Sequence, residues 1–160
     1  MKERNGEHPF GDAGQLILLC FFLAVWLVDS FLIQKTTFLS EHVPLYVRLV
    51  IMALSPIAAA CLFKSGHGVV SDDSRPAGVV STGAFRYVRH PLYLAGILFY
   101  PGLAVSTASL FSLALLAMIF IFYNHIASFE ERLLLEKFGE SYETYKKKTG
   151  RWVPRIAGAG

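Results

Sequence analysis

The chain has 160 residues, of which 54% are hydrophobic and 17% are charged, and its formal net charge is +3. Ordinary soluble domains carry about 25% charged residues. Together with a mean hydropathy of +0.46, this composition excludes an ordinary soluble domain and predicts an integral membrane protein. At this length we expect a single domain over residues 1–160.

Four apolar segments approach the roughly 20 residues that a helix needs to cross about 30 Å of hydrocarbon. They predict an all-α bundle of four transmembrane helices, over residues 15–33, 44–63, 91–105 and 109–127. The third segment is short and is interrupted by Pro101 and Gly102, which predicts local thinning or tilting. The sequence Ser-Thr-Ala-Ser after it is typical of a tight turn, so the third and fourth spans are predicted to form a helical hairpin.

The distribution of basic residues predicts the orientation of these spans. With four spans, 13 of the 15 Lys and Arg residues lie on one side, the exceptions being Lys35 and Arg48. Cytoplasmic loops carry an excess of Lys and Arg. We therefore expect a multi-pass protein with both termini in the cytoplasm, in the inner membrane if the cell is bacterial.

Two segments outside the spans are predicted to lie on this cytoplasmic side. Residues 64–90 are rich in Gly, Ser and Asp and predict a loop, with a short extended piece at residues 78–83. Residues 128–149 predict a pair of amphipathic helices along the inner leaflet. The lysines at 146–148 would contact anionic lipid, so membrane lipids are expected partners and nucleic acid is not.

Arg89, His90 and Tyr93 stand where the third span begins. Arg89 suits a cytoplasmic anchor and Tyr93 an interfacial aromatic belt. The alternative is a binding site, because a guanidinium and an imidazole at a helix N-terminus favour an anion. Both interpretations remain open at this point.

Glu130 and Glu131 follow the fourth span, and with Ser128 they form the pattern of a capping box. The predicted hairpin would instead bring them to the membrane depth of Arg89 and His90. Such an arrangement would place a guanidinium and an imidazole opposite two carboxylates. These groups together suit a zwitterionic ligand that also carries hydroxyl groups. Neighbours on a helix point about 100° apart, so only one glutamate can face such a ligand squarely.

Other polar residues at the span ends give no metal pattern. His67, His90 and His125 lack the carboxylate or cysteine spacing of a metal site, so no metal is predicted. Asn124 and His125, at the end of the fourth span, could line the same cavity as the glutamates.

Two stretches, "STGAFRYVRHPLYLAG" and, about 35 residues later, "FEERLLLEKFGESYETYKKKTGRWVP", share an ordered set of motifs: Arg-His-Pro-x-Tyr, Glu-Glu, Phe-Gly-x-x-Tyr-x-x-Tyr and Arg-Trp-x-Pro. Over residues 78–154 the chain resembles the superfamily of isoprenylcysteine carboxyl methyltransferases and phospholipid methyltransferases. The resemblance implies S-adenosylmethionine as methyl donor, in a cytoplasm-facing pocket between the last two spans and the C-terminal helices. The residues it implies for that pocket are Arg89, His90, Tyr93, Gly96, Glu130 and Glu131.

The same resemblance implies a reaction, for which His90, Arg89 and Glu131 are the expected catalytic group. The acceptor would be lipophilic: an isoprenylcysteine-like carboxylate, which needs no base, or a phospholipid amine, whose proton could pass to His90 or a glutamate. Two other interpretations stay open, a membrane reductase that uses a nicotinamide cofactor and a non-catalytic membrane scaffold. The sequence does not choose the acceptor.

Overall fold

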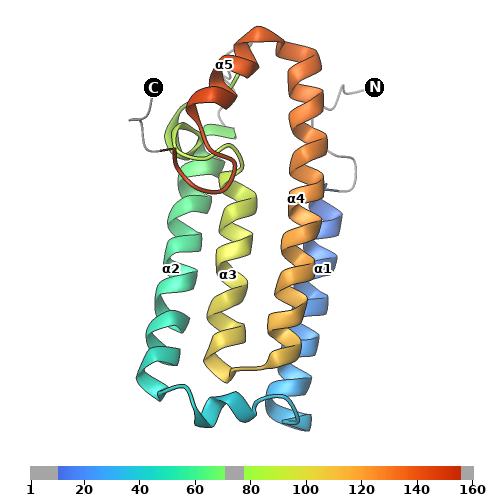
Figure 1. Ribbon diagram of the computed structural model, residues 1–160, viewed down its shortest axis with the longest axis vertical. Coiled ribbons are helices and arrows are strands. Elements are labelled where there is room, and N and C mark those ends of the chain that lie inside the picture. Colours follow the sequence, from blue (N-terminus) through green and yellow to red (C-terminus); the bar gives the residue numbers. More distant parts are fainter. Residues whose placement is uncertain (1–10, 71–77, 156–160) are drawn as a thin grey trace.

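The computed structural model describes residues 11–70 and 78–155, and within these ranges the chain forms helices and no strand. Four long helices run side by side, and a short fifth helix lies across one end of the bundle (Figure 1). The helices are α1 (Gly11–Leu27), continued by a π-helix at Val28–Ile33, then α2 (Leu45–Val70), α3 (Pro91–Thr107), α4 (Leu110–Phe138) and α5 (Glu140–Lys148). The prediction of an all-α fold is confirmed.

Three of the helical segments are long and apolar enough to cross a membrane. They are Gly14–Ile33, Leu45–Val69 and Leu110–Phe138. The helix α3 is also apolar, but its 17 residues correspond to a length of roughly 26 Å at 1.5 Å per residue. The fourth span therefore stays a prediction, and α3 is a shorter apolar helix.

The helix α3 is continuous, and the predicted interruption at Pro101 and Gly102 is wrong. Gly102 is buried at a close contact between α3 and α2. A Cβ atom added there would lie 2.8 Å from Cβ of Ser55, closer than such atoms approach in proteins. The hydroxyl of Ser55 on α2 donates a hydrogen bond to the carbonyl of Leu98 on α3. The absence of a side chain at Gly102 therefore lets α2 pack directly against α3.

A tight turn joins α3 to α4 and confirms the predicted hairpin. The chain leaves α3 through Ala108, which has a φ of 51°. Ser109 then caps α4, because its hydroxyl accepts a hydrogen bond from the backbone N–H of Ser112 at 3.1 Å. The same hydroxyl also contacts the carboxylate of the buried Asp29 and thereby ties α1 to the start of α4.

Two helix boundaries differ from the sequence-based predictions. Residues 64–70 were predicted to be loop but continue α2, and residues 128–138 continue α4 instead of starting a separate helix. The break comes at Gly139, whose φ of 52° is accessible to glycine. Ser128 is therefore inside a helix and donates to the carbonyl of Asn124 at 2.8 Å, so the capping-box interpretation is wrong. Gly78–Ser81 form no strand, and a 3₁₀ turn follows at Gly83–Arg86.

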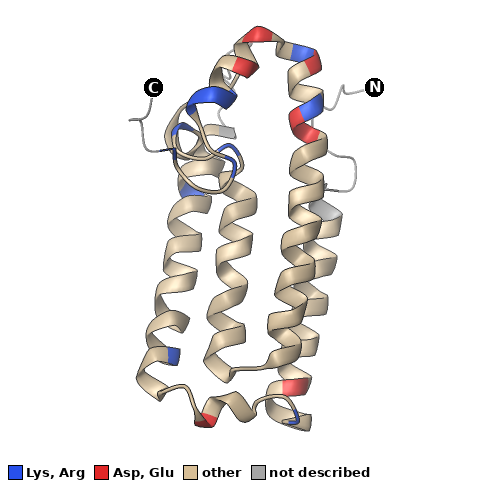
Figure 2. Cartoon of the chain, viewed as in Figure 1, with Lys and Arg blue, Asp and Glu red and all other residues tan. Residues whose placement is uncertain are grey.

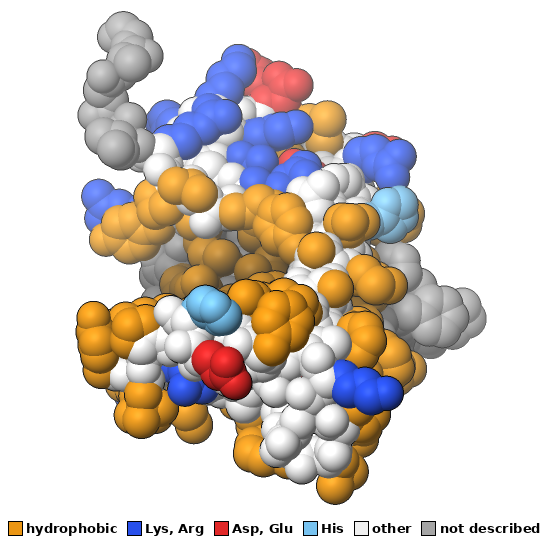
Figure 3. Space-filling view, turned by 60° about the horizontal axis from the view of Figure 1, so that its bottom comes forward, with side chains coloured by type: hydrophobic (Ala, Val, Ile, Leu, Met, Phe, Trp, Pro, Cys, Tyr) orange, Lys and Arg blue, Asp and Glu red, His pale blue; other side chains and the backbone are white. Residues whose placement is uncertain are grey.

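Charged residues gather at the end of the bundle where α3 begins and α5 lies across it (Figure 2). Figure 3 shows Lys and Arg side chains gathered at the top of the view, with patches of hydrophobic side chains below them. Lys35 and Arg48, in contrast, belong to the opposite end.

Candidate functional site

Arg89 connects the start of α3 to the segment that follows α5. Its backbone N–H donates to the carbonyl of Gly150 at 2.9 Å, beside an isolated bridge between Val88 and Gly150. Its guanidinium donates to the carbonyls of Thr149 and Lys146 and, through Nε, to Oε1 of Glu131 at 2.9 Å. Arg89 is 9% exposed. Every one of these contacts is internal, so Arg89 fixes the position of the segment after α5.

Glu131 is the centre of an ion-pair network. Its carboxylate accepts hydrogen bonds from Arg89 and, at 2.9 and 2.8 Å, from Nε and Nη2 of Arg151. Nε2 of His90 lies 3.3 Å from the same carboxylate. The side chain of Glu131 is only 4% exposed. A buried carboxylate is stable only where hydrogen-bond donors and opposite charges surround it. The two guanidinium groups supply that compensation.

Arg151 holds the C-terminal segment against α4. Besides the two bonds to Glu131, its Nη1 donates to Oδ1 of Asn124 at 3.0 Å and to the hydroxyl of Ser128 at 2.9 Å. The hydrogen bonds that Arg151 donates to the Glu131 carboxylate raise the pKa of Arg151 above its ordinary value. Trp152 reaches the same amide oxygen through its indole N–H, at 3.3 Å. The segment 149–152 therefore folds back over the site.

Sequence reasoning did not assign Arg151 and Trp152 to the site. A signal existed in the Arg-Trp-x-Pro motif, but spacing along the chain could not show that this motif returns to α4. Asn124 was expected to line the site and does contact both residues. His125, named with it, is exposed.

Glu130 has a different environment from its neighbour. The hydroxyl of Tyr93 donates to one of its oxygens, and Nδ1 of His90 lies 3.6 Å from the other. The rings of His90 and Tyr93 stack with centroids 5.6 Å apart. The side chain of Glu130 is 13% exposed, against 4% for Glu131. The structure thus brings Arg89, His90, Tyr93, Glu130 and Glu131 into one cluster.

Gly96, one turn along α3 from Tyr93, lies below this cluster. A Cβ atom at Gly96 would lie 3.0 Å from the hydroxyl of Tyr123 on α4. The ring of Tyr123 is in turn 5.4 Å from that of Tyr93. Gly96 therefore permits close approach of α4 and borders the cluster from the membrane side.

Two tyrosines of α5 fix the helix over the site. Burial raises the pKa of Tyr142, and it raises the pKa of Tyr145 to about 12. Both phenols therefore stay protonated and uncharged near neutral pH. The hydroxyl of Tyr145 donates to the carbonyl of Phe85 at 2.7 Å, which joins α5 to the chain ahead of α3.

The cluster is rich in donors and charges of both signs. Over residues 11–70 and 78–155, no group of three or more His, Cys, Asp or Glu side chains is placed to hold a metal ion. What the cluster offers is hydrogen-bond donors, carboxylates and aromatic faces at the mouth of an apolar bundle. Such a set can bind a small polar ligand that carries both charges.

Comparison with known proteins places this cluster inside a matched region. Residues 67–141 match the family model described as phospholipid methyltransferase. The chain is 31% identical over 91 residues, 56% of its length, to the protein-S-isoprenylcysteine O-methyltransferase of Schizosaccharomyces pombe. It is 30% identical over 86 residues, 54% of its length, to methanethiol S-methyltransferase 1 of Bradyrhizobium diazoefficiens. It is 35% identical over 80 residues, 49% of its length, to the cobalt-zinc-cadmium resistance protein CzcN of Cupriavidus metallidurans.

These matches span 39%, 30% and 37% of the lengths of the three relatives. The family model includes every predicted site residue, from Arg89 to Glu131, but ends before Arg151. Two of the three relatives are named as methyltransferases with different acceptors. Over the matched residues the chain is similar to the superfamily of membrane methyltransferases that includes the isoprenylcysteine carboxyl and phospholipid methyltransferases.

Proposed function

We propose that this protein transfers a methyl group from S-adenosylmethionine to a lipophilic acceptor at the cytoplasmic face of the membrane. The observation that carries the proposal is the polar cluster around His90 and Glu131, which lies in the region matched by the family model. Its residues come from both helices of the hairpin and are held together by the segment that follows α5.

The chemistry of the cluster suits the donor, a zwitterion with ribose hydroxyls and a sulfonium. Glu130 is the carboxylate suited to hydroxyl or ammonium donors, because its side chain is more exposed than that of Glu131 and it lies against Tyr93 and His90. The aromatic faces of His90 and Tyr93 suit a cation, and such contacts contribute about 0.5–2 kcal/mol. When bound, S-adenosylmethionine would supply an activated methyl group.

The cationic groups divide into two kinds. Arg89 and Glu131 are buried and engaged with each other, so we assign them to positioning the segment 149–152. The side chain of Arg151 is 26% exposed and that of Lys146 is 47% exposed. Arg151 is bonded to Glu131, Asn124 and Ser128, so the more exposed Lys146 is better placed to attract the carboxylate of a ligand from the cytosol.

The protein's main contribution to the reaction would be alignment and exclusion of water, which in well-oriented systems lowers barriers by several kcal/mol. An acceptor carboxylate is already a nucleophile. An acceptor amine must lose a proton, and His90 is the group in the cluster whose ordinary pKa, near 6.5, suits that role. We propose an isoprenylcysteine-like carboxylate as the first acceptor class to test and a phospholipid amine as the second.

A transfer assay tests this function. The purified protein in detergent would be incubated with S-adenosylmethionine labelled in its methyl group and with candidate acceptors of both classes. We expect label in the organic phase with the parent protein and with His125→Ala, a histidine of α4 that is exposed. We expect its loss with His90→Ala and Glu130→Gln. A folded parent that labels no acceptor of either class, or labelling that survives in both variants, would contradict the proposal.

A further inference from the structure

A buried polar group lies at the hairpin end of the bundle, where a turn joins α3 to α4, opposite the end that carries α5 (Figure 1). Its centre is Asp29, which is 2% exposed and belongs to the apolar segment Gly14–Ile33. The other members each bring a hydroxyl or an indole N–H: Trp26, Ser30, Thr36, Thr107, Ser109 and Ser112. A buried ionisable side chain within a membrane-spanning segment is costly and marks a candidate functional site.

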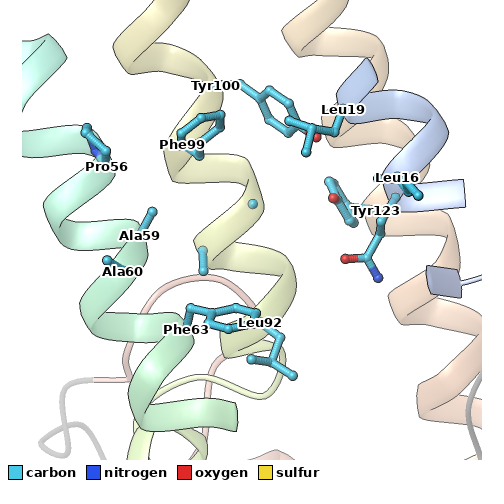
Figure 4. A pocket seen from close by; sticks show the side chains of 13 residues that line it. Leu16, Leu19, Pro56, Ala59, Ala60, Phe63, Leu92, Phe99, Tyr100 and Tyr123 are labelled. Carbon is cyan, nitrogen blue, oxygen red and sulfur yellow. The ribbon is translucent and has the colours of Figure 1, made fainter. Parts of the chain in front are cut away.

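This group is separate from the polar cluster and from the apolar cavity of about 530 Å³ that borders the cluster (Figure 4). On α1 the cavity lining ends at Leu19, ten residues or roughly 15 Å of helix before Asp29. On α3 it ends at Tyr100, seven residues before Thr107. No member of the group lines the cavity. The role of the group is therefore independent of the proposed methyl transfer.

The π-helix at Val28–Ile33 turns Asp29 toward the hairpin. Its hydrogen bonds span five residues, as the backbone N–H of Gln34 donates to the carbonyl of Asp29 at 2.8 Å. Asp29 and Ser30 are the buried residues of this helix, and its four other residues are exposed. Single π-helical turns within α-helices are frequent at functional sites. Here the change of register places two neighbouring polar side chains on the inner side of the bundle.

The Asp29 carboxylate is bound by two hydroxyl groups through one of its oxygens. Thr36, which precedes α2, and Ser109, in the turn before α4, both donate to Oδ2. Ser109 is also the N-cap of α4, so the carboxylate lies near the positive end of that helix dipole. These contacts join α1, the segment before α2 and the start of α4 around a single negative charge.

The other carboxylate oxygen, Oδ1, is buried and has no hydrogen-bond partner. Within residues 11–70 and 78–155, no Lys, Arg or His side chain forms an ion pair with Asp29. A buried carboxylate without an opposite charge is strongly unfavourable. An unpartnered buried oxygen of this kind points to a bound water molecule or ion. The adjoining Ser30 and Thr107 add two hydroxyl oxygens, which lie 2.8 Å apart.

We propose that the hairpin end binds a monovalent metal cation, with Na⁺ as the first candidate, through Oδ1 of Asp29 and neighbouring hydroxyl oxygens. Carboxylate and hydroxyl oxygens are hard ligands, and the group contains no His or Cys, which softer transition metals prefer. The single carboxylate carries one negative charge, so a monovalent cation neutralises it, whereas a divalent cation would leave a buried positive charge. The cation would hold α1 against the α3–α4 hairpin and takes no part in the chemistry at the other end.

Thermal unfolding of the full chain in detergent tests this site. The midpoint would be measured in increasing NaCl and, at the same ionic strength, in N-methyl-D-glucamine chloride, whose cation is too large to enter a buried site. A ligand that binds only the folded state stabilises it in proportion to the logarithm of its concentration above saturation. We expect the midpoint to rise by a few degrees for each tenfold increase in Na⁺. Identical midpoints in the two salts would show that an internal water satisfies Oδ1 and would overturn the proposal.

Two acidic residues at the same end provide matched variants. Asp29→Asn keeps the size of the side chain and removes its charge, so we expect the response to Na⁺ to be lost. Glu41→Gln removes an exposed carboxylate from the short helix Phe38–Glu41, and its response should equal that of the parent. A response to Na⁺ that survives in Asp29→Asn, or that is lost in Glu41→Gln, would overturn the assignment to Asp29.

A direct binding measurement on the parent needs no variant. Equilibrium dialysis of the detergent-purified protein against radioactive Na⁺, with N-methyl-D-glucamine chloride holding the ionic strength, should show saturable retention that approaches one ion per chain. Retention that rises without saturation, as at a charged surface, would overturn the proposal. Neither measurement involves a methyl donor, so the cation site and the proposed function can fail separately.

Discussion

At the scale of single residues, the adjacent glutamates have separate roles. Glu131 faces Arg89 and Arg151 and is almost fully buried, whereas Glu130 contacts Tyr93 and His90 and is more exposed. Adjacent positions on a helix point about 100° apart. We therefore expect Glu131 to hold the C-terminal segment in place, and we propose Glu130 as the carboxylate that contacts a ligand.

This division predicts different consequences for two similar substitutions. Glu131→Gln removes the charge that compensates two guanidinium groups, and breaking a buried ion pair costs about 3–5 kcal/mol. We expect a clear fall in the midpoint of thermal unfolding, measured by circular dichroism in detergent. Glu130→Gln is the matched control and should leave the midpoint within a few degrees of the parent. Equal destabilisation by both variants would contradict the division.

At the scale of elements, the hairpin of α3 and α4 and the contact of α2 with α3 set the geometry of the site. The sequence allowed the hairpin to be predicted, because a short polar turn separates two apolar segments. It also placed Arg89, His90 and Glu131 at one membrane depth. The continuation of α2 to Val70 was missed because the stretch rich in glycine and serine was taken as loop, and tertiary packing outweighs such local preference.

The return of Arg151 to α4 could not be predicted for a related reason. It depends on the direction in which the chain leaves α5, and neither hydrophobic periodicity nor motif spacing determines that direction. The resemblance identified the Arg-Trp-x-Pro motif but gave it no partner. The structure supplies that partner, Glu131.

The contact between α2 and α3 gives a second prediction. Gly102→Val should destabilise the bundle, because even a Cβ atom there would lie 2.8 Å from Cβ of Ser55. We expect a loss of about 1–3 kcal/mol, typical of overpacking, measured as lower resistance to thermal unfolding. Gly68→Ala in α2 is the control: no atom lies within 4 Å of a Cβ there, so stability should hold or rise slightly. Unchanged stability of Gly102→Val would show that the two helices are less closely packed.

At the scale of the whole molecule, charge asymmetry predicts how the bundle sits in the membrane. The end that carries the polar cluster and α5 has most of the described lysines and arginines (Figure 2). By the positive-inside tendency we expect that end to face the cytoplasm. The proposed donor would then enter from the cytosol, and a lipophilic acceptor would enter from the adjacent leaflet.

Single cysteines at opposite ends test this orientation. In a background with Cys20→Ala and Cys61→Ala, we expect Lys148→Cys to react with a membrane-impermeant maleimide only after the cells are opened. Lys35→Cys, at the other end, should react in intact cells. The reverse pattern would place the polar cluster outside the cell and remove access to a cytosolic donor.

The central claim, that the polar cluster binds the methyl donor, is tested most directly by calorimetric titration of S-adenosylmethionine into the detergent-purified protein. We predict saturable binding by the parent and by His125→Ala, and its loss in His90→Ala and Glu130→Gln with unfolding midpoints unchanged. A folded parent that shows no binding heat in several detergents, or variants that bind as tightly as the parent, would contradict the account.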